Sequence, residues 1–201
     1  MEVPRLAVKS TAEEWAEQGH SLFRSRRFAQ AMHSFERAGM QREMDIASAY
    51  HLREKARLLQ PGSRQADAQR SVAYALAADA FQKCADAGGS DAKAYYRNAG
   101  DCYSRAGDAE HAAGAYLSAG EYTLSAQHFR KAGLFDEAVQ VVQANRKHVE
   151  PAFADVLIDT ARVFYLREQV QFHSKLQPTK LRSSTEPVSY THLTLPTILR
   201  V

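Results

Sequence analysis

Three stretches of the sequence repeat one spacing of aromatic, small and alanine residues, and this spacing limits the fold more than any other feature. Each stretch opens with an aromatic residue, has a glycine or alanine four positions later, and has a large apolar residue three positions after that. An alanine then follows the opening residue by sixteen positions, and another large apolar residue comes four later. The copies are Trp15, Gly19, Leu22, Ala31 and Phe35; Tyr96, Gly100, Tyr103, Ala112 and Tyr116; and Tyr122, Ala126, Phe129, Ala138 and Val142.

Residues that lie four and then three positions apart occupy one face of an α-helix, so this spacing describes a helix in close contact with a second one. The small residue would let the second helix approach, and the later alanine and its large neighbour would fill the remaining space. Short turns are expected at residues 26–28, 106–108 and 132–134. Gly107 and Gly133 in two of these turns suit a left-handed helix end. The repeat therefore predicts an all-α fold, an α-solenoid of antiparallel helix pairs.

A longer helix pair is expected between the first and second copies of the repeat. The first helix of this pair runs from about Met44 to Leu59, and Pro61-Gly62-Ser63 ends it. The second runs from Ala68 to Ala87, and within it Ala77 and Phe81 repeat the step from alanine to a large apolar residue. This pair would join the first copy to the other two in one continuous row.

One helical domain over residues 11–174 accounts for these patterns, with a last helix from about Pro151 to His173 as its cap. We expect residues 1–10 to be a disordered N-terminus and residues 175–201, which include a stretch rich in serine, threonine and proline, to be a disordered tail. From about position 188 the tail resembles an in-frame translation of a transposase adapter used in sequencing libraries. We interpret it as an artefact of the gene model; the alternative is a short β-prone linear motif, since its pattern alternates.

The charge of the helical body is balanced, although the whole chain has a net charge of +3. The chain has 26 basic and 23 acidic residues, of which four bases and one acid follow position 174, so 22 of each sign remain before it. Binding to phosphates requires a concentrated basic face. The only basic cluster in the body is Arg24, Arg26 and Arg27, so direct binding of nucleic acid is not expected.

Motifs for catalysis, cofactors and metals are missing from the sequence. Gly88-Gly89-Ser90 lacks the lysine and the glycine spacing of a phosphate-binding loop. There is no Cys-x-x-Cys or His-Glu-x-x-His pair for zinc. Asp101 lies four residues after Arg97 and four before Arg105, which is the spacing of an ion-paired helix face. We therefore expect no catalytic residue, no cofactor and no metal, and a chain that is not an enzyme.

Cys84 and Cys102 lie in helical patterns among alanine and aromatic residues, where we expect buried, reduced thiols. No run of about 18 apolar residues is present, so the sequence predicts no transmembrane helix. The first residues do not have the pattern of a secretory signal. These observations lead us to expect an intracellular protein, either cytoplasmic or nuclear.

The repeated residues resemble the tetratricopeptide pattern of tryptophan, glycine, tyrosine, alanine and phenylalanine. In that family the first helix of each pair lines a concave surface that binds peptides. By this resemblance a mildly basic groove, suited to an acidic or carboxylate-ended peptide, would form from polar residues on those helices. The residues that the resemblance assigns to partner binding are His20, Arg24, Arg97, Asp101, Arg105, Gln127 and Lys131.

A closer resemblance is carried by longer strings of sequence: "EEWAEQGHSLFRSRRFAQAMHSFERAG", "AYHLREKAR", "AYYRNAGDCY" and "FRKAGLFDEAV". They look like the repeat region of very large fungal proteins with tetratricopeptide and ankyrin repeats or a UvrD-like helicase. This resemblance implies that the chain is a fragment and that the ATP-dependent helicase chemistry lies outside it.

Three functions remain open from the sequence. The first is a non-catalytic helical-repeat scaffold for protein–protein or intramolecular contacts. The alternative is an accessory region of a UvrD-like superfamily-1 helicase, whose core would be its partner; such a region would have a large exposed apolar patch. The third is a free-standing solenoid that binds RNA or DNA, which would lose affinity steeply as salt rises; the balanced charge argues against it.

Overall fold

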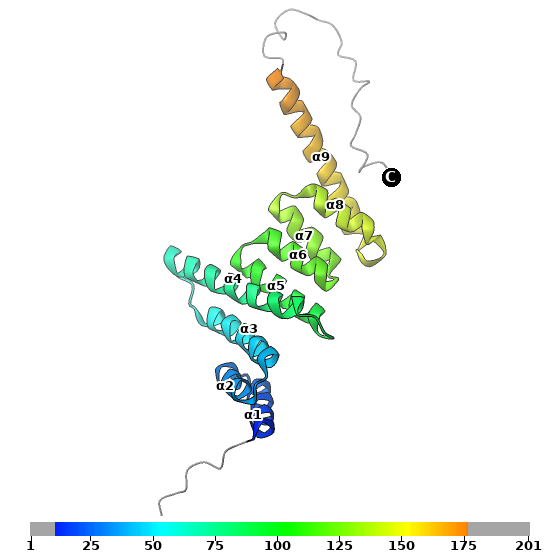
Figure 1. Ribbon diagram of the computed structural model, residues 1–201. Coiled ribbons are helices and arrows are strands. Elements are labelled where there is room, and N and C mark those ends of the chain that lie inside the picture. Colours follow the sequence, from blue (N-terminus) through cyan, green and yellow to red (C-terminus); the bar gives the residue numbers. More distant parts are fainter. Residues whose placement is uncertain (1–10, 177–201) are drawn as a thin grey trace, which may run out of the picture.

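The computed structural model describes the chain from residue 11 to residue 176, and the regular structure in that range is helical (Figure 1). The α-helices are α1 (Ala12–Arg24), α2 (Phe28–Ala38), α3 (Gln41–Leu58), α4 (Arg64–Asp86), α5 (Ala92–Ala106), α6 (Ala109–Ala119), α7 (Tyr122–Ala132), α8 (Phe135–Ala144) and α9 (Pro151–Leu176), with a 3-10 helix η1 (Arg146–His148) before α9. The predicted all-α class is confirmed for this range. The expectations for residues 1–10 and 177–201 lie outside the described residues.

Helices that follow one another in the sequence also pack against one another in space. The extensive contacts among the described helices join consecutive partners, from α1 with α2 to α8 with α9. The helices consequently form an elongated row, with α1 and α2 at one end and α9 at the other (Figure 1). Such a row needs only short connections and contacts that are local in sequence.

The ends of the helices follow local sequence signals. Gly107 and Gly133 adopt left-handed conformations, with φ of 86° and 83°, and end α5 and α7 as the sequence predicts. The two long helices begin earlier than expected, α3 at Gln41 and α4 at Arg64. For α4 the reason is Ser63, whose hydroxyl oxygen accepts a hydrogen bond of 3.1 Å from the amide N–H of Ala66. A serine at this position satisfies an otherwise unpaired backbone donor of the first turn.

The small residues of the repeat lie where two helices come closest. A Cβ atom added at Gly19 would be 2.6 Å from the ring of Phe35, and one added at Gly100 would be 2.9 Å from the ring of Tyr116. Both distances are shorter than a Cβ atom tolerates, so these rings occupy the space that a side chain would need. The predicted close approach of α1 to α2 and of α5 to α6 is therefore confirmed.

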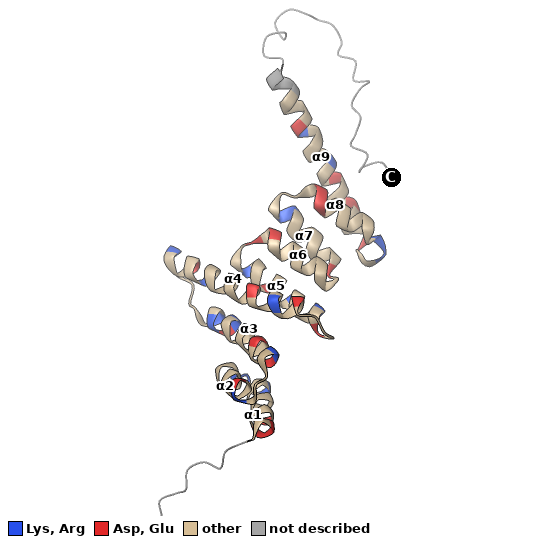
Figure 2. Cartoon of the chain, viewed as in Figure 1, with Lys and Arg blue, Asp and Glu red and all other residues tan. Residues whose placement is uncertain are grey.

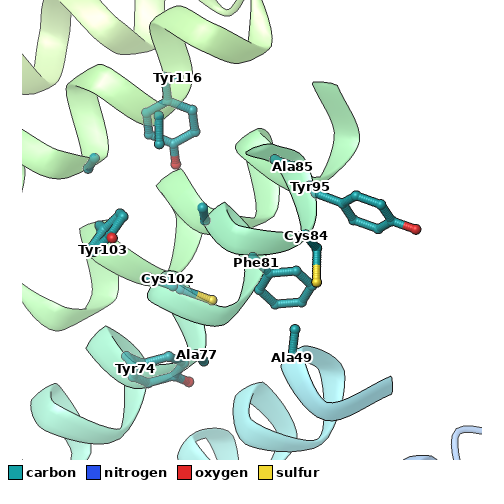
Figure 3. Close-up of a cluster of buried hydrophobic side chains, with 14 of the residues drawn as sticks. Ala49, Tyr74, Ala77, Phe81, Cys84, Ala85, Tyr95, Cys102, Tyr103 and Tyr116 are labelled. Atoms are coloured by element: carbon teal, nitrogen blue, oxygen red, sulfur yellow. The ribbon is translucent and has the colours of Figure 1, made fainter. Parts of the chain in front are cut away.

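The largest buried cluster extends from α3 to α6 and combines alanines with aromatic rings (Figure 3). Phe81 is fully buried at its centre, and its ring lies 5.0 Å from that of Tyr50 in an edge-to-face contact. Tyr50 in turn stacks on Phe28 of α2 at 5.3 Å. Aromatic pairs of this geometry are stabilising beyond the area they bury, and this chain of rings connects α2, α3 and α4.

Both cysteines are buried and free, as the sequence predicts. They lie in the central cluster, Cys84 on α4 and Cys102 on α5 (Figure 3). Burial raises the pKa of the Cys102 thiol to about 11 and also raises the pKa of Cys84. Because the thiolate is the reactive form, these two thiols serve as small apolar groups of the core.

The replacement of Gly100 by alanine tests the close approach of α5 and α6. The added Cβ atom would overlap the Tyr116 ring, so we expect Gly100→Ala to lower the free energy of unfolding by about 1–3 kcal/mol. Gly114 on α6 is the matched control, because a Cβ atom there would meet nothing within 4 Å. Gly114→Ala should raise the stability by about 0.5–1 kcal/mol, since alanine loses less backbone entropy on folding. Urea denaturation followed by circular dichroism measures both, and equal effects would contradict the close contact.

Candidate functional site

The polar residues that the sequence assigns to partner binding lie on three helices. His20 and Arg24 belong to α1, and Gln127 and Lys131 belong to α7; all four are exposed. The other three, Arg97, Asp101 and Arg105, follow one another along α5 at intervals of four. No extensive contact joins α1 to α5 or α7 among the described helices. The structure therefore leaves the α1 pair apart from the others, and α6 lies between α5 and α7, in contact with both.

The three α5 residues are held by the neighbouring helices. Asp101 accepts a hydrogen bond of 2.7 Å from the hydroxyl of Tyr116 on α6, and Arg105 donates one of 3.3 Å to the hydroxyl of Tyr74 on α4. Arg97 lies 3.4 Å from the carboxylate of Glu121, the residue that precedes α7. The expected ion pairs along α5 are thus replaced by contacts between helices, and these side chains fix how α4, α5, α6 and α7 pack.

A tyrosine hydroxyl bonded to an aspartate recurs between neighbouring helices. Tyr103 of α5 donates to Asp79 of α4 at 2.7 Å, in the same way that Tyr116 of α6 donates to Asp101. Burial, and then the hydrogen bond to the carboxylate, raises the pKa of both tyrosines well above the ordinary value. Tyr96 makes a third such bond of 2.7 Å, to Asp86. The hydroxyls of these tyrosines are satisfied; the rings of Tyr103 and Tyr116 are buried, and Tyr96 is half-buried.

On α1 and α7 the predicted residues are exposed, and each of these helices also has a histidine ring that contacts an aromatic ring of a neighbouring helix. The ring of His20 packs edge-on against Phe35 at 5.1 Å. A surface hollow of about 660 Å³ adjoins His20 and Arg24, and its lining residues all belong to α1. On α7, His128 lies between Gln127 and Lys131 in the sequence and faces the interior, with its ring 5.3 Å from that of Tyr116.

The fold also perturbs the titration of His128, which lies near the predicted site. Its Nδ1 atom is buried and has no hydrogen-bond partner among the described residues. Burial lowers the pKa of the imidazole, the nearby charge of Lys131 lowers it further, and Asp101 opposes these effects. His128 is therefore favoured in its neutral form between α6 and α7.

A larger groove, which the sequence analysis did not identify, lies between α3 and α4 and has a volume of about 690 Å³. Its apolar lining consists of Leu52 from α3, of Leu76, Ala80 and Cys84 from α4, and of Ala87 just after α4. Four charged side chains also line it, namely Arg42 and Asp45 from α3 and Asp79 and Lys83 from α4. Leu76 is 54% exposed although it is a large aliphatic residue.

One feature of the sequence indicates this groove. Val72 and Leu76 are spaced by four on α4, so they share a helix face. That face is turned away from Tyr74, Ala78 and Phe81, which are buried. Two large aliphatic residues on the outer side of a core helix are an unexpected pair. The repeat pattern accounts for the buried residues Ala77 and Phe81 and does not account for Val72 and Leu76.

The outer face of α9 has the other concentration of exposed aliphatic residues. Leu157, Ile158 and Ala161 are buried in the clusters that α9 forms with the preceding helices. On the opposite side of α9, Val156, Val163, Leu166 and Val170 are exposed, with Val163 and Val170 at 66% and 68%. These four residues form one stripe along the helix, which we call the α9 stripe.

Charges of both signs are distributed along the helices from α1 to α8 (Figure 2). The described residues contain no group of three or more histidine, cysteine, aspartate or glutamate side chains that could hold a metal ion. Within the same part of the chain, no helix has the length and hydropathy needed to cross a membrane. Comparison of the chain with family models, with curated proteins and with solved structures gave no match.

The lowered pKa of His128 predicts how stability depends on pH. The unfolded chain binds a proton near the ordinary value of 6.5 and the folded chain does so only at lower pH. The folded state is therefore stabilised above about pH 6.5 relative to acid, and this contribution is lost as pH falls below that value. His128→Phe keeps a ring beside Tyr116 and cannot bind a proton, so its stability should fall less than that of the wild type between pH 7.5 and 5.5.

Thermal or urea denaturation across that pH range tests this prediction. Gln127→Ala is the control, because Gln127 is the exposed neighbour on the same helix and does not titrate. It should follow the wild-type pH profile. Parallel profiles for His128→Phe and the wild type would show that His128 titrates normally in the folded protein.

Proposed function

We propose that the chain is a non-catalytic helical-repeat scaffold of the tetratricopeptide-like kind that binds another protein or peptide. The observation that carries this proposal is the groove between α3 and α4. It is concave, has aliphatic side chains on both sides and has a few charged groups around them, which is the composition of surfaces that bind other molecules specifically. Aliphatic side chains left exposed in such a place mark an interaction site more often than a monomer surface.

The arrangement of the helices supports the solenoid part of this proposal. In a solenoid each unit contacts only its neighbours, and the row of units presents an extended surface to a partner. The consecutive packing from α1 to α9 has that character. The polar residues on α5 support the non-catalytic part, because Arg97, Asp101 and Arg105 are engaged with neighbouring helices and contribute to packing.

A capture experiment with paired variants tests the scaffold proposal. The chain immobilised as bait should enrich a partner from an extract, and Leu76→Asp should abolish this enrichment because a charge would replace an aliphatic contact in the groove. Leu117→Asp is the control, since Leu117 is an exposed aliphatic residue on α6, away from the groove. Proteins enriched equally by the wild type and by Leu76→Asp would count against the groove.

The α9 stripe favours a second candidate function, an accessory region of a UvrD-like superfamily-1 helicase or ATPase. A helix that belongs to a larger assembly buries both of its apolar faces, and α9 has one face against α7 and α8 and a second, aliphatic face exposed. The partner would then be a folded domain such as the helicase core. This candidate is compatible with the first, because the groove and the stripe lie on different helices.

The two candidates are separated by a variant in the stripe. Val163→Asp should leave the fold intact, since Val163 is 66% exposed, and should abolish binding to a folded domain that covers α9. The same variant should leave capture through the α3–α4 groove unchanged. A partner lost with Val163→Asp and kept with Leu76→Asp would favour the accessory role, and the reverse result would favour the peptide-binding scaffold.

A further inference from the structure

We infer that the groove between α3 and α4 binds an amphipathic helix of a partner protein, with a leucine-type side chain at one end and a carboxylate about two turns away. The inference rests on the proposed scaffold function and names the chemistry of the partner. It follows from how the charged and aliphatic residues are distributed along the groove.

The groove has a cationic end and an aliphatic end. Arg42, near the start of α3, donates a hydrogen bond to the carbonyl oxygen of Gly88, just beyond the end of α4, so the two helices run antiparallel. Arg42 and Lys83 therefore lie toward one end of the groove, and Leu52 and Leu76 lie toward the other. A ligand with separate apolar and charged ends fits this distribution in one direction only.

Most of the charges along the groove already have partners within the protein. Asp45 accepts a hydrogen bond of 2.9 Å from Gln41, and Asp79 accepts one of 2.7 Å from Tyr103. Arg42 is bound to the carbonyl of Gly88. Among the described residues, the ammonium group of Lys83 has no hydrogen bond or ion pair, and Lys83 is exposed.

Lys83 is therefore the charge that a ligand can pair with, and its natural partner is a carboxylate. Asp79 lies one turn from Lys83 toward the aliphatic end and would repel a carboxylate placed there, whereas Asp45, near Cys84, already accepts a hydrogen bond from Gln41. The acidic residue of the ligand is thus restricted to the cationic end, beside Lys83 and Arg42.

The walls of the groove favour a helical ligand over an extended one. Both walls are α-helices, whose backbone groups are already paired, so an extended peptide would find no ladder of backbone partners. A helical ligand satisfies its own backbone and can pack along two antiparallel helices. Leu76 and Lys83 are seven residues apart, or about 10 Å along α4. A ligand helix of the same rise needs a leucine and a glutamate seven positions apart to contact both.

A pair of synthetic helical peptides tests this inference with the full chain. One peptide carries leucines on one face and a glutamate seven positions from the first leucine; the other has lysine in place of that glutamate. Fluorescence anisotropy should give about five- to tenfold tighter binding of the glutamate peptide at low salt, with a smaller difference at high salt. Leu76→Asp should weaken both peptides by at least about tenfold, because both depend on the aliphatic end.

Charge reversal at Lys83 is the decisive variant. Lys83→Glu should reverse the preference, so that the lysine peptide binds more tightly, and Lys93→Glu should keep the wild-type preference, since Lys93 is an exposed lysine on α5 that does not line the groove. A preference for glutamate that survives Lys83→Glu would overturn the inference. Binding that depends on Leu76 and shows no charge preference would also overturn it, while leaving the scaffold proposal standing. Failure of both peptides to bind the wild type at millimolar concentration would overturn the inference. The proposed function would be overturned only if the wild type and Leu76→Asp enriched the same proteins equally in the capture experiment.

Discussion

The packing of an aromatic ring against a residue without a Cβ atom is the contact on which the arrangement of these helices depends. Phe35 and Tyr116 lie where side chains of Gly19 and Gly100 would have to be, so α1 and α2, and likewise α5 and α6, approach more closely than larger residues would allow. Because the ring belongs to the second helix and the glycine to the first, each pair defines its own geometry. Alanines at 0% exposure on the same faces, such as Ala31 and Ala112, complete the contact. The geometry of these two pairs is therefore specified locally, and contacts such as that between α4 and α5 join the pairs into the row.

Tyr116 also shows how packing and polarity are coupled in this protein. Its ring fills the space above Gly100 and its hydroxyl donates to Asp101, one residue further along the same helix. On its other side the ring contacts His128, whose neutral form the burial between α6 and α7 favours. A single side chain thus connects α5, α6 and α7, and the charge of Asp101 is committed to this junction. The polar surface of α5 has a structural purpose that its sequence spacing alone does not reveal.

The all-helical class and two of the helix contacts could be predicted from the sequence, whereas the availability of the polar side chains could not, and the difference has a physical reason. The spacing of Gly100, Tyr103 and Tyr116 indicates a contact between two helices, and this spacing can be read directly from the sequence. Whether Arg97 or Lys83 is available to a ligand depends on which neighbour lies within hydrogen-bonding distance, and that neighbour belongs to another helix. Arg97 proves to be paired with Glu121, the residue that precedes α7. Lys83, four residues from Asp79 in the sequence, has no hydrogen bond or ion pair within the described part of the chain, and Asp79 accepts a hydrogen bond from Tyr103.

Exposed aliphatic side chains are concentrated on α4 and α9. Arg97, Asp101 and Arg105 on α5 contact neighbouring elements, whereas Leu76 on α4 and the α9 stripe expose aliphatic area that contributes nothing to the core. Exposed leucine and valine side chains add little to the stability of a monomer, and water is released when a partner covers them. The groove differs from the stripe in being concave between two helices, with Lys83 about two turns from Leu76 at its aliphatic end. Aliphatic area supplies affinity in both places, and in the groove the charge of Lys83 also gives the partner a direction, so the groove is suited to selective recognition.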